Sequence, residues 1–183
     1  MINKKKVESI ERLATELISK YSIDKPSIPI DMIAQKEGLS LVSHDLGENV
    51  SGVLVIKDKK GIIGYNVNHA KVRRRFTIAH ELGHYVLHGH LSDKDEVFVD
   101  KDFIVKFRNN INSYNKAEER QESEANAFAA ALLMPEHLIE KEFENSHLAE
   151  MGEPELISYL AKKFEVSVLA MTYRLTNLNL FVY

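Results

Sequence analysis

The sequence contains no cysteine, and this absence removes two kinds of site at once. A disulfide framework is excluded, and no metal ion can be held by thiolate ligands. Any bound metal must therefore be coordinated by nitrogen and oxygen atoms. The chain has eight histidines that can supply the nitrogen.

A strong net charge is absent as well. The formal net charge is −3 and the sequence pI is about 6.2. No overall positive field therefore favours nucleic acid, and we do not expect direct nucleic-acid binding.

Long apolar runs are also missing. No run approaches the roughly 20 residues that a membrane-spanning helix needs. The N-terminal residues are charged, with Lys4, Lys5 and Lys6 followed closely by Glu8 and Glu11, so the apolar region of a signal peptide is missing too. We expect no membrane association and a cytoplasmic location.

The hydrophobic content is sufficient for a folded core. Hydrophobic residues make up 44% of the 183 residues, which argues against disorder. The length suits one domain. We therefore expect a single domain over residues 1–183, with a helical pair over 154–178 as a possible appendage.

The spacing of apolar residues changes along the chain and predicts an α+β fold. The segments 39–43, 51–57 and 61–67 are short and β-branched, and predict a small, mainly antiparallel sheet. Asp31 is the expected cap of a short helix that ends near Lys36. The long polar segment 91–117 is a candidate lid, and residues 97–105 are a stretch within it that could form local structure. Helical spacing is found over residues 4–20, 69–88, 118–133, 135–145, 154–164 and 167–178.

The main chemical motif is His80-Glu81-Leu82-Gly83-His84. Two histidines four residues apart on a helix lie on one face, about 6 Å apart along the axis, and can bind one Zn²⁺. Glu81 follows the first histidine and is the expected general base, which takes a proton from a metal-bound water. Apolar neighbours such as Ile78 and Leu82 place this helix in the interior, where polar groups need partners.

A catalytic zinc site usually has a third protein ligand, and the sequence offers two alternatives. His90 lies ten residues after His80, the spacing of the metzincin pattern, but that pattern has glycine at position 87 for a sharp turn, where this chain has Leu87. Glu122 on the helix over 118–133 is favoured. Asn126 lies one turn further along the same face and is the expected hydrogen-bond partner of a histidine ring. Glu124 points to another side of that helix.

Two long motifs in this order resemble the ImmA/IrrE family of metallopeptidases. They are residues 73–88, RRRFTIAHELGHYVLH, and residues 122–135, ESEANAFAAALLMP. The resemblance extends over nearly all of the chain. The segment between the motifs is long here, since 122 − 84 = 38.

The resemblance implies a zincin-like metallopeptidase domain whose small sheet packs on a helical core with the motif helix at its centre. It implies His80, His84 and Glu122 as metal ligands and Glu81 as the base. Zinc is the expected metal, with Mn²⁺ or another divalent ion as the alternative. Members of the family typically cleave or otherwise inactivate helix-turn-helix repressors of the XRE type.

Several other residues are candidates for supporting the site or contacting substrate. They are Tyr85, His88, Gly52 and Arg75. The segment around Gly52 is a candidate edge strand to which a peptide substrate could add by backbone pairing. Arg75 belongs to a run of three arginines that we expect to pair with carboxylates and support the motif helix.

The sequence thus predicts a zinc-dependent endopeptidase that performs limited proteolysis of a regulatory protein, an XRE-type repressor in particular. One alternative is a non-proteolytic binding module that sequesters a repressor. The other is a DNA-binding regulator, because residues 160–175 resemble a helix-turn-helix unit. The second helix of that unit contains only one cation, Arg174, which argues against DNA binding.

Overall fold

The computed structural model describes residues 2–57, 60–89, 96–101, 116–144, 148 and 151–180. Within this part of the chain the elements follow in the order α1 (Lys4–Lys20), α2 (Ile30–Lys36), β1 (Leu39–His44), β2 (Val50–Lys57), β3 (Lys60–Asn66), α3 (Lys71–Leu87), β4 (Glu96–Lys101), α5 (Lys116–Leu133), α6 (Glu136–Phe143), α7 (Glu153–Phe164) and α8 (Val168–Asn177). The predicted α+β fold is confirmed.

The described strands form one sheet in the order β1-β3-β2-β4. β2 pairs antiparallel with both β3 and β4, whereas β1 and β3 are parallel. The sheet is therefore mainly antiparallel, as predicted. The parallel pair arises because β2 and β3 form a hairpin, and β1 then joins the far side of β3.

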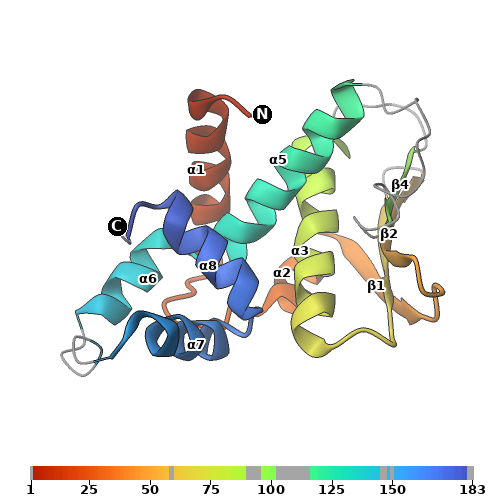
Figure 1. Ribbon diagram of the computed structural model, residues 1–183. Coiled ribbons are helices and arrows are strands. Elements are labelled where there is room, and N and C mark those ends of the chain that lie inside the picture. Colours follow the sequence, from red (N-terminus) through yellow and green to blue (C-terminus); the bar gives the residue numbers. More distant parts are fainter. Residues whose placement is uncertain are drawn as a thin grey trace.

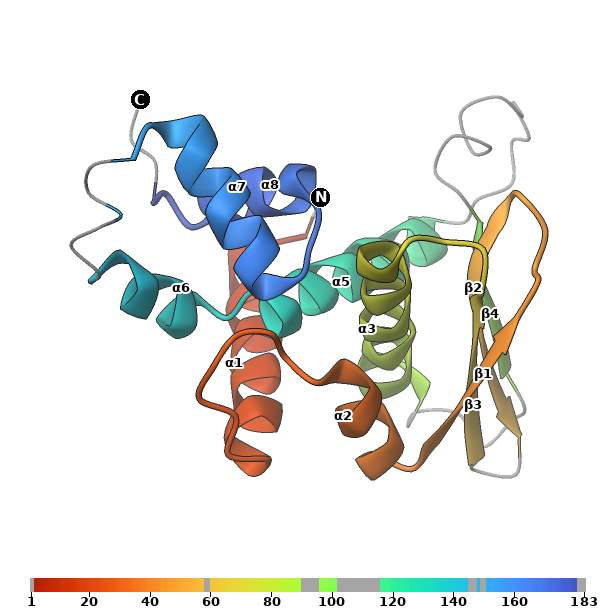
Figure 2. The same cartoon turned by 90° about the horizontal axis from the view of Figure 1, so that it is seen from below.

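The helices gather on one side of the sheet. Figure 2 shows the strands seen nearly edge-on, with α3 next to them and the other helices beyond α3. α3 contacts β2 and β3 on one side and α5 on the other. The motif helix is therefore central, because it forms the layer between the sheet and the remaining helices.

One hydrophobic cluster connects these layers. α1 contributes Ile10, Ala14 and Ile18, whose spacing places them on the face that packs against α5. At the other end of the chain, α7 and α8 contribute Phe164, Met171 and Leu175, among others. No described helix combines the length and the apolar character needed to cross a membrane.

Two expectations for local structure need correction. Asp31 does not cap α2, because the helix already begins at Ile30 with Pro29 at the cap position, and Asp31 lies in the first turn. The segment 91–117 is shorter than predicted, because α5 begins at Lys116; the local structure expected within 97–105 is the strand β4. The rest of the candidate lid, residues 91–95 and 102–115, lies outside the described residues.

Candidate metal centre

The middle of α3 is buried on all sides, between the sheet and α5. Its buried residues run without interruption from Thr77 to His84 and include the polar side chains of His80, Glu81 and His84. Polar groups in such a setting must find partners, because burial without them is costly. Their arrangement is therefore informative about what this helix does.

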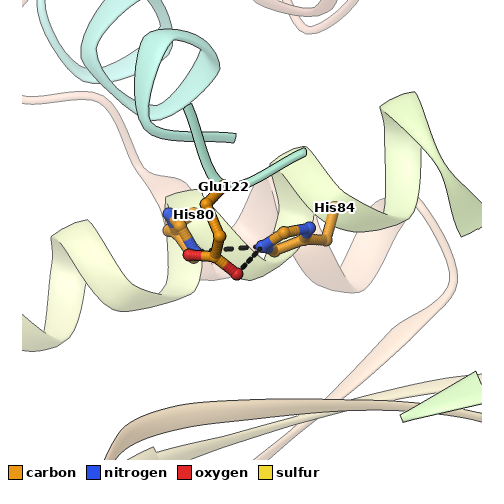
Figure 3. A group of neighbouring side chains, drawn as sticks. All are labelled: His80, His84 and Glu122. Atoms are coloured by element: carbon orange, nitrogen blue, oxygen red, sulfur yellow. Dashed lines mark hydrogen bonds and ion pairs between the residues drawn. The ribbon is translucent and has the colours of Figure 1, made fainter. Parts of the chain in front are cut away.

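The two imidazoles and one carboxylate from α5 point toward a common centre (Figure 3). His80 Nε2 and His84 Nε2 are 3.0 Å apart. Glu122 Oε2 is 3.6 Å from His80 Nε2, and Glu122 Oε1 is 3.4 Å from His84 Nε2. Among the described residues, His80, His84 and Glu122 form the group of side chains that could hold a metal ion.

These separations fit a metal ion. A tetrahedral ion about 2.0–2.1 Å from each ligand atom places those atoms roughly 3.3 Å from one another. The two nitrogens are somewhat closer than that, and each lies slightly farther than that from one of the two Glu122 oxygens. The donor set of two nitrogens and one carboxylate oxygen leaves a fourth position for water or substrate, which is the usual composition of a catalytic site.

Asn126 determines which nitrogen of His80 faces the centre. Its Oδ1 lies 3.0 Å from His80 Nδ1. A carbonyl oxygen can only accept, so Nδ1 carries the proton and donates it. The lone pair of His80 is then on Nε2, where a metal would need it.

Glu122 is held in its charged form. Burial alone would raise the pKa of this carboxyl, but the neighbouring imidazoles of His80 and His84 outweigh burial and hold its pKa far below the usual range. An ionised carboxylate is the form that binds metal.

Glu81 is fully buried and faces β2 at Gly52. A Cβ at position 52 would lie 2.9 Å from Glu81 Oε1 and 2.3 Å from Thr77 Cγ2. Only glycine therefore lets the strand lie this close to the carboxylate. Gly52 is thus a neighbour of the candidate base.

The expectation that a substrate pairs with the strand at Gly52 is wrong. β2 lies inside the sheet, and Gly52 is paired with Tyr65 on one side and Asp100 on the other. Its backbone is therefore already used by neighbouring strands. Among the described strands, β1 and β4 are the ones at the edges.

The approach of α5 depends on Gly83, which the sequence analysis did not single out. A Cβ at Gly83 would lie 3.2 Å from Ala125 Cα and 3.1 Å from Phe128 Cδ1. The two helices can therefore pack closely just where Glu122 must reach the histidines. A glycine inside a helix lowers the stability of that helix by about 1 kcal/mol relative to alanine. Its presence in the motif helix was therefore the available signal of a close packing contact.

Phe98 on β4 was also missed. Its ring stacks on His84 with centroids 4.9 Å apart and an interplanar angle of 24°. Phe98 lies in the segment that was interpreted as a loop, and a short alternation of apolar residues around it was the only local signal. Its contact limits the ways in which the His84 ring can turn.

His88 lies beside a second carboxylate, that of Glu124. His88 Nε2 is 3.9 Å from Glu124 Oε2, and burial lowers the pKa of His88. Glu124 is buried and pairs with Lys6 at 3.0 Å and Arg120 at 2.7 Å. Its charge is thus balanced by two cations on the side of α5 away from Glu122.

Two further candidates, Tyr85 and Arg75, contact other elements of the fold. Tyr85 packs against the core beside β3, where its ring approaches Gly61. Arg75 donates from Nη2 to the Ile28 carbonyl at 2.8 Å and from Nε to the Glu165 carbonyl at 3.2 Å. These bonds join α3 to the segment before α2 and to the end of α7, so Arg75 supports the helix. His90 lies outside the described residues.

Comparisons with known proteins indicate the family and the fold of the chain. The family model described as IrrE N-terminal-like domain, a peptidase family, matches residues 34–176. A solved structure of a Mycobacterium tuberculosis transcriptional regulator has the same fold, with a TM-score of 0.61 and 18% identity over 92% of this chain. The match covers 46% of that regulator, so this chain spans less than half of its length.

A comparison with curated proteins found no significant match. The family match covers most of the chain, including every residue of the candidate metal centre. It supports a metallopeptidase-like domain and a divalent metal at the site. The chain therefore belongs to the peptidase family of the IrrE N-terminal-like domain.

Proposed function

We propose that the protein is a zinc-dependent endopeptidase that makes limited cuts in a regulatory protein. The observation that carries the proposal is the convergence of His80, His84 and Glu122, together with the buried Glu81 that follows His80 on the same helix. A site used only for structure is normally closed by a fourth protein ligand and has no use for a base.

The residues of the site have two proposed roles, metal binding and proton transfer. His80, His84 and Glu122 would hold the ion, with Asn126 orienting His80. A bound ion would lower the pKa of a water molecule and polarise the carbonyl of the peptide bond. Glu81 would accept a proton as the water oxygen bonds to the carbonyl carbon, and would deliver it to the amine as the C–N bond breaks. Zinc suits two imidazoles and a carboxylate best, and Mn²⁺ is the main alternative.

We further propose that the substrate is a helix-turn-helix repressor of the XRE type. The support is the resemblance of the two long motifs to ImmA/IrrE proteins and the likeness of the fold to a transcriptional regulator. A role in DNA binding has less support, because Arg174, the one cation of α8, is buried and paired with Glu11.

The test combines metal analysis with cleavage. We expect about one divalent ion per chain, lost in His80→Ala. Cleavage of a co-encoded helix-turn-helix repressor should fall by a factor of about 10²–10⁴ in Glu81→Gln, while the metal is retained. Glu118→Gln, on the exposed side of α5, is the matched control and should cleave normally.

Two results would contradict the proposal. Normal cleavage by Glu81→Gln would remove the general base from the mechanism. Binding of the repressor by the wild type without any cleavage would favour the non-proteolytic module instead.

A further inference from the structure

A large groove lies among four helices beside the candidate metal centre. Its volume is about 1010 Å³, and its walls come from α1, α3, α5 and α8. Ile2, just before α1, also lines it. The volume is at the upper end of small-ligand pockets, so there is room for several side chains.

The groove borders the metal centre, although the ligands themselves do not line it. Phe76 and Asn126 both line it, and both contact His80. The Phe76 ring stacks on the His80 ring with centroids 6.4 Å apart, and Asn126 Oδ1 accepts from His80 Nδ1. A polypeptide whose peptide bond lies at the centre would therefore have neighbouring residues at the mouth of this groove.

The lining is largely apolar, and part of it is exposed to solvent. Leu169 and Tyr173 lie one turn apart on α8 and are 63% and 64% exposed. Val7 of α1 adds a third large side chain across the groove. Exposed aromatic and aliphatic side chains gathered beside a functional site are typical of a binding surface.

Two of the three charged residues in the groove neutralise each other. Arg174 donates from Nη2 to Glu11 Oε2 at 2.9 Å and from Nε to the Met134 carbonyl at 2.9 Å. Its Nη1 also donates to Glu11. The third is Arg73, whose Nη2 donates to Ser51 Oγ at 2.9 Å. Most of the remaining lining is apolar, so the groove favours an apolar segment.

We propose that this groove binds bulky aliphatic or aromatic side chains of the protein substrate, next to the bond that is cut. The inference rests on the proposed function, because the protein substrate is its occupant. It also gives the C-terminal pair α7–α8 a role. This pair resembles a DNA-reading unit in sequence, but α8 forms the outer wall of the groove with its apolar side chains.

A binding experiment tests the groove without requiring cleavage. The probe is a dansyl-labelled amphipathic peptide with leucines on one face, compared with its leucine-to-serine counterpart by fluorescence anisotropy. The protein is the full chain with Glu81→Gln, so that the peptide stays intact. We expect the leucine peptide to bind, and the combined change Leu169→Ser with Tyr173→Ser to weaken its binding about tenfold.

Val168→Ser is the matched control. Val168 is on the same helix and 52% exposed, but it does not line the groove. It should bind the peptide as the parent protein does. All three positions are exposed, so thermal unfolding midpoints should be nearly unchanged, which separates loss of binding from loss of folding.

The second measurement is a cleavage profile of the metal-loaded protein on a pool of peptides from a denatured proteome. We expect bulky apolar residues to be enriched at one fixed position relative to the cut. The combined Leu169→Ser and Tyr173→Ser change should reduce that enrichment more than the total number of cuts.

The outcomes separate this inference from the proposed function. Binding that depends on Leu169 and Tyr173, without any cleavage, supports the groove and contradicts proteolysis. Cleavage with an unchanged profile and unchanged binding in the groove variant contradicts the groove and leaves proteolysis standing. A wild-type dimer that the groove variant converts to monomer would show that a second copy of the chain is the occupant, and would overturn the proposal.

Discussion

Two pairs of helices in this molecule bury polar side chains in different ways. Between α1 and α8, the buried Arg174 of α8 meets the carboxylate of Glu11, so opposite charges are matched (Figure 1 shows α8 beside α1). Between α3 and α5, His80, His84 and Glu122 converge with their lone pairs toward one point. A matched pair holds elements together, whereas convergent lone pairs create a site for a cation. The difference indicates which pair stabilises the fold and which carries chemistry.

Arg174→Ala should give the largest loss of stability among the changes that leave the metal centre untouched. It removes the partner of Glu11 and the donor to the Met134 carbonyl, so the free energy of unfolding should fall by about 3 kcal/mol. Denaturant unfolding of the metal-free protein measures this. Arg12→Ala, which breaks an exposed pair with Glu16, should cost less than about 1 kcal/mol. Loss of metal affinity in Arg174→Ala would show that the two helix pairs are not separate in function.

Asn126→Ala should lower metal affinity and leave stability nearly unchanged, which is the reverse of the effect expected for Arg174→Ala. The side chain is exposed apart from its bond to His80, so stability should change little, while metal affinity should fall about 10–100-fold. Competition with a chelator gives the affinity. Ser123→Ala, on the exposed side of the same helix, is the control. Unchanged metal affinity in Asn126→Ala would mean that His80 is oriented without its help.

Gly52→Ala should reduce cleavage while leaving metal affinity nearly intact. The new methyl group would press on Thr77 Cγ2 and Glu81 Oε1 and displace the base, which should lower kcat about tenfold. Gly152→Ala is the control, because nothing lies within 4 Å of a Cβ there. If metal affinity fell as much as kcat, then β2 would be shaping the ligands and not only the base.

The smallest effect on stability should come from protonation of Glu165, near the α7–α8 turn, at low pH. Hydrogen bonds from Lys71 and then Ser27 hold the pKa of Glu165 below its ordinary value of 4.5. A lowered pKa stabilises the fold above the unfolded-state value, and this contribution is lost as pH falls through the folded-state value. Below about pH 4.5, wild type and Glu165→Gln should therefore converge in thermal midpoint. A gap that widens in acid would contradict this assignment.

Much of the secondary structure was predictable because it depends on neighbours in sequence. The apolar spacing of α1 and α3 indicated their faces, and the ends of these helices agree closely with the prediction. β4 was predicted only as unspecified local structure within residues 97–105, because a single short strand has little local signal. Its existence depends on pairing with β2, more than forty residues away in sequence (96 − 50 = 46 between their first residues).

The geometry of His80, Glu81 and His84 was determined by the sequence itself, because a helix places residues four apart on one face whatever surrounds it. The contact with Glu122 was decided only by tertiary structure, since it depends on Gly83 packing against Ala125. The same holds for Gly52 beside Glu81 and for the groove between α1, α3, α5 and α8. These features join segments far apart in the chain, and their formation depends on how the elements pack rather than on any local pattern.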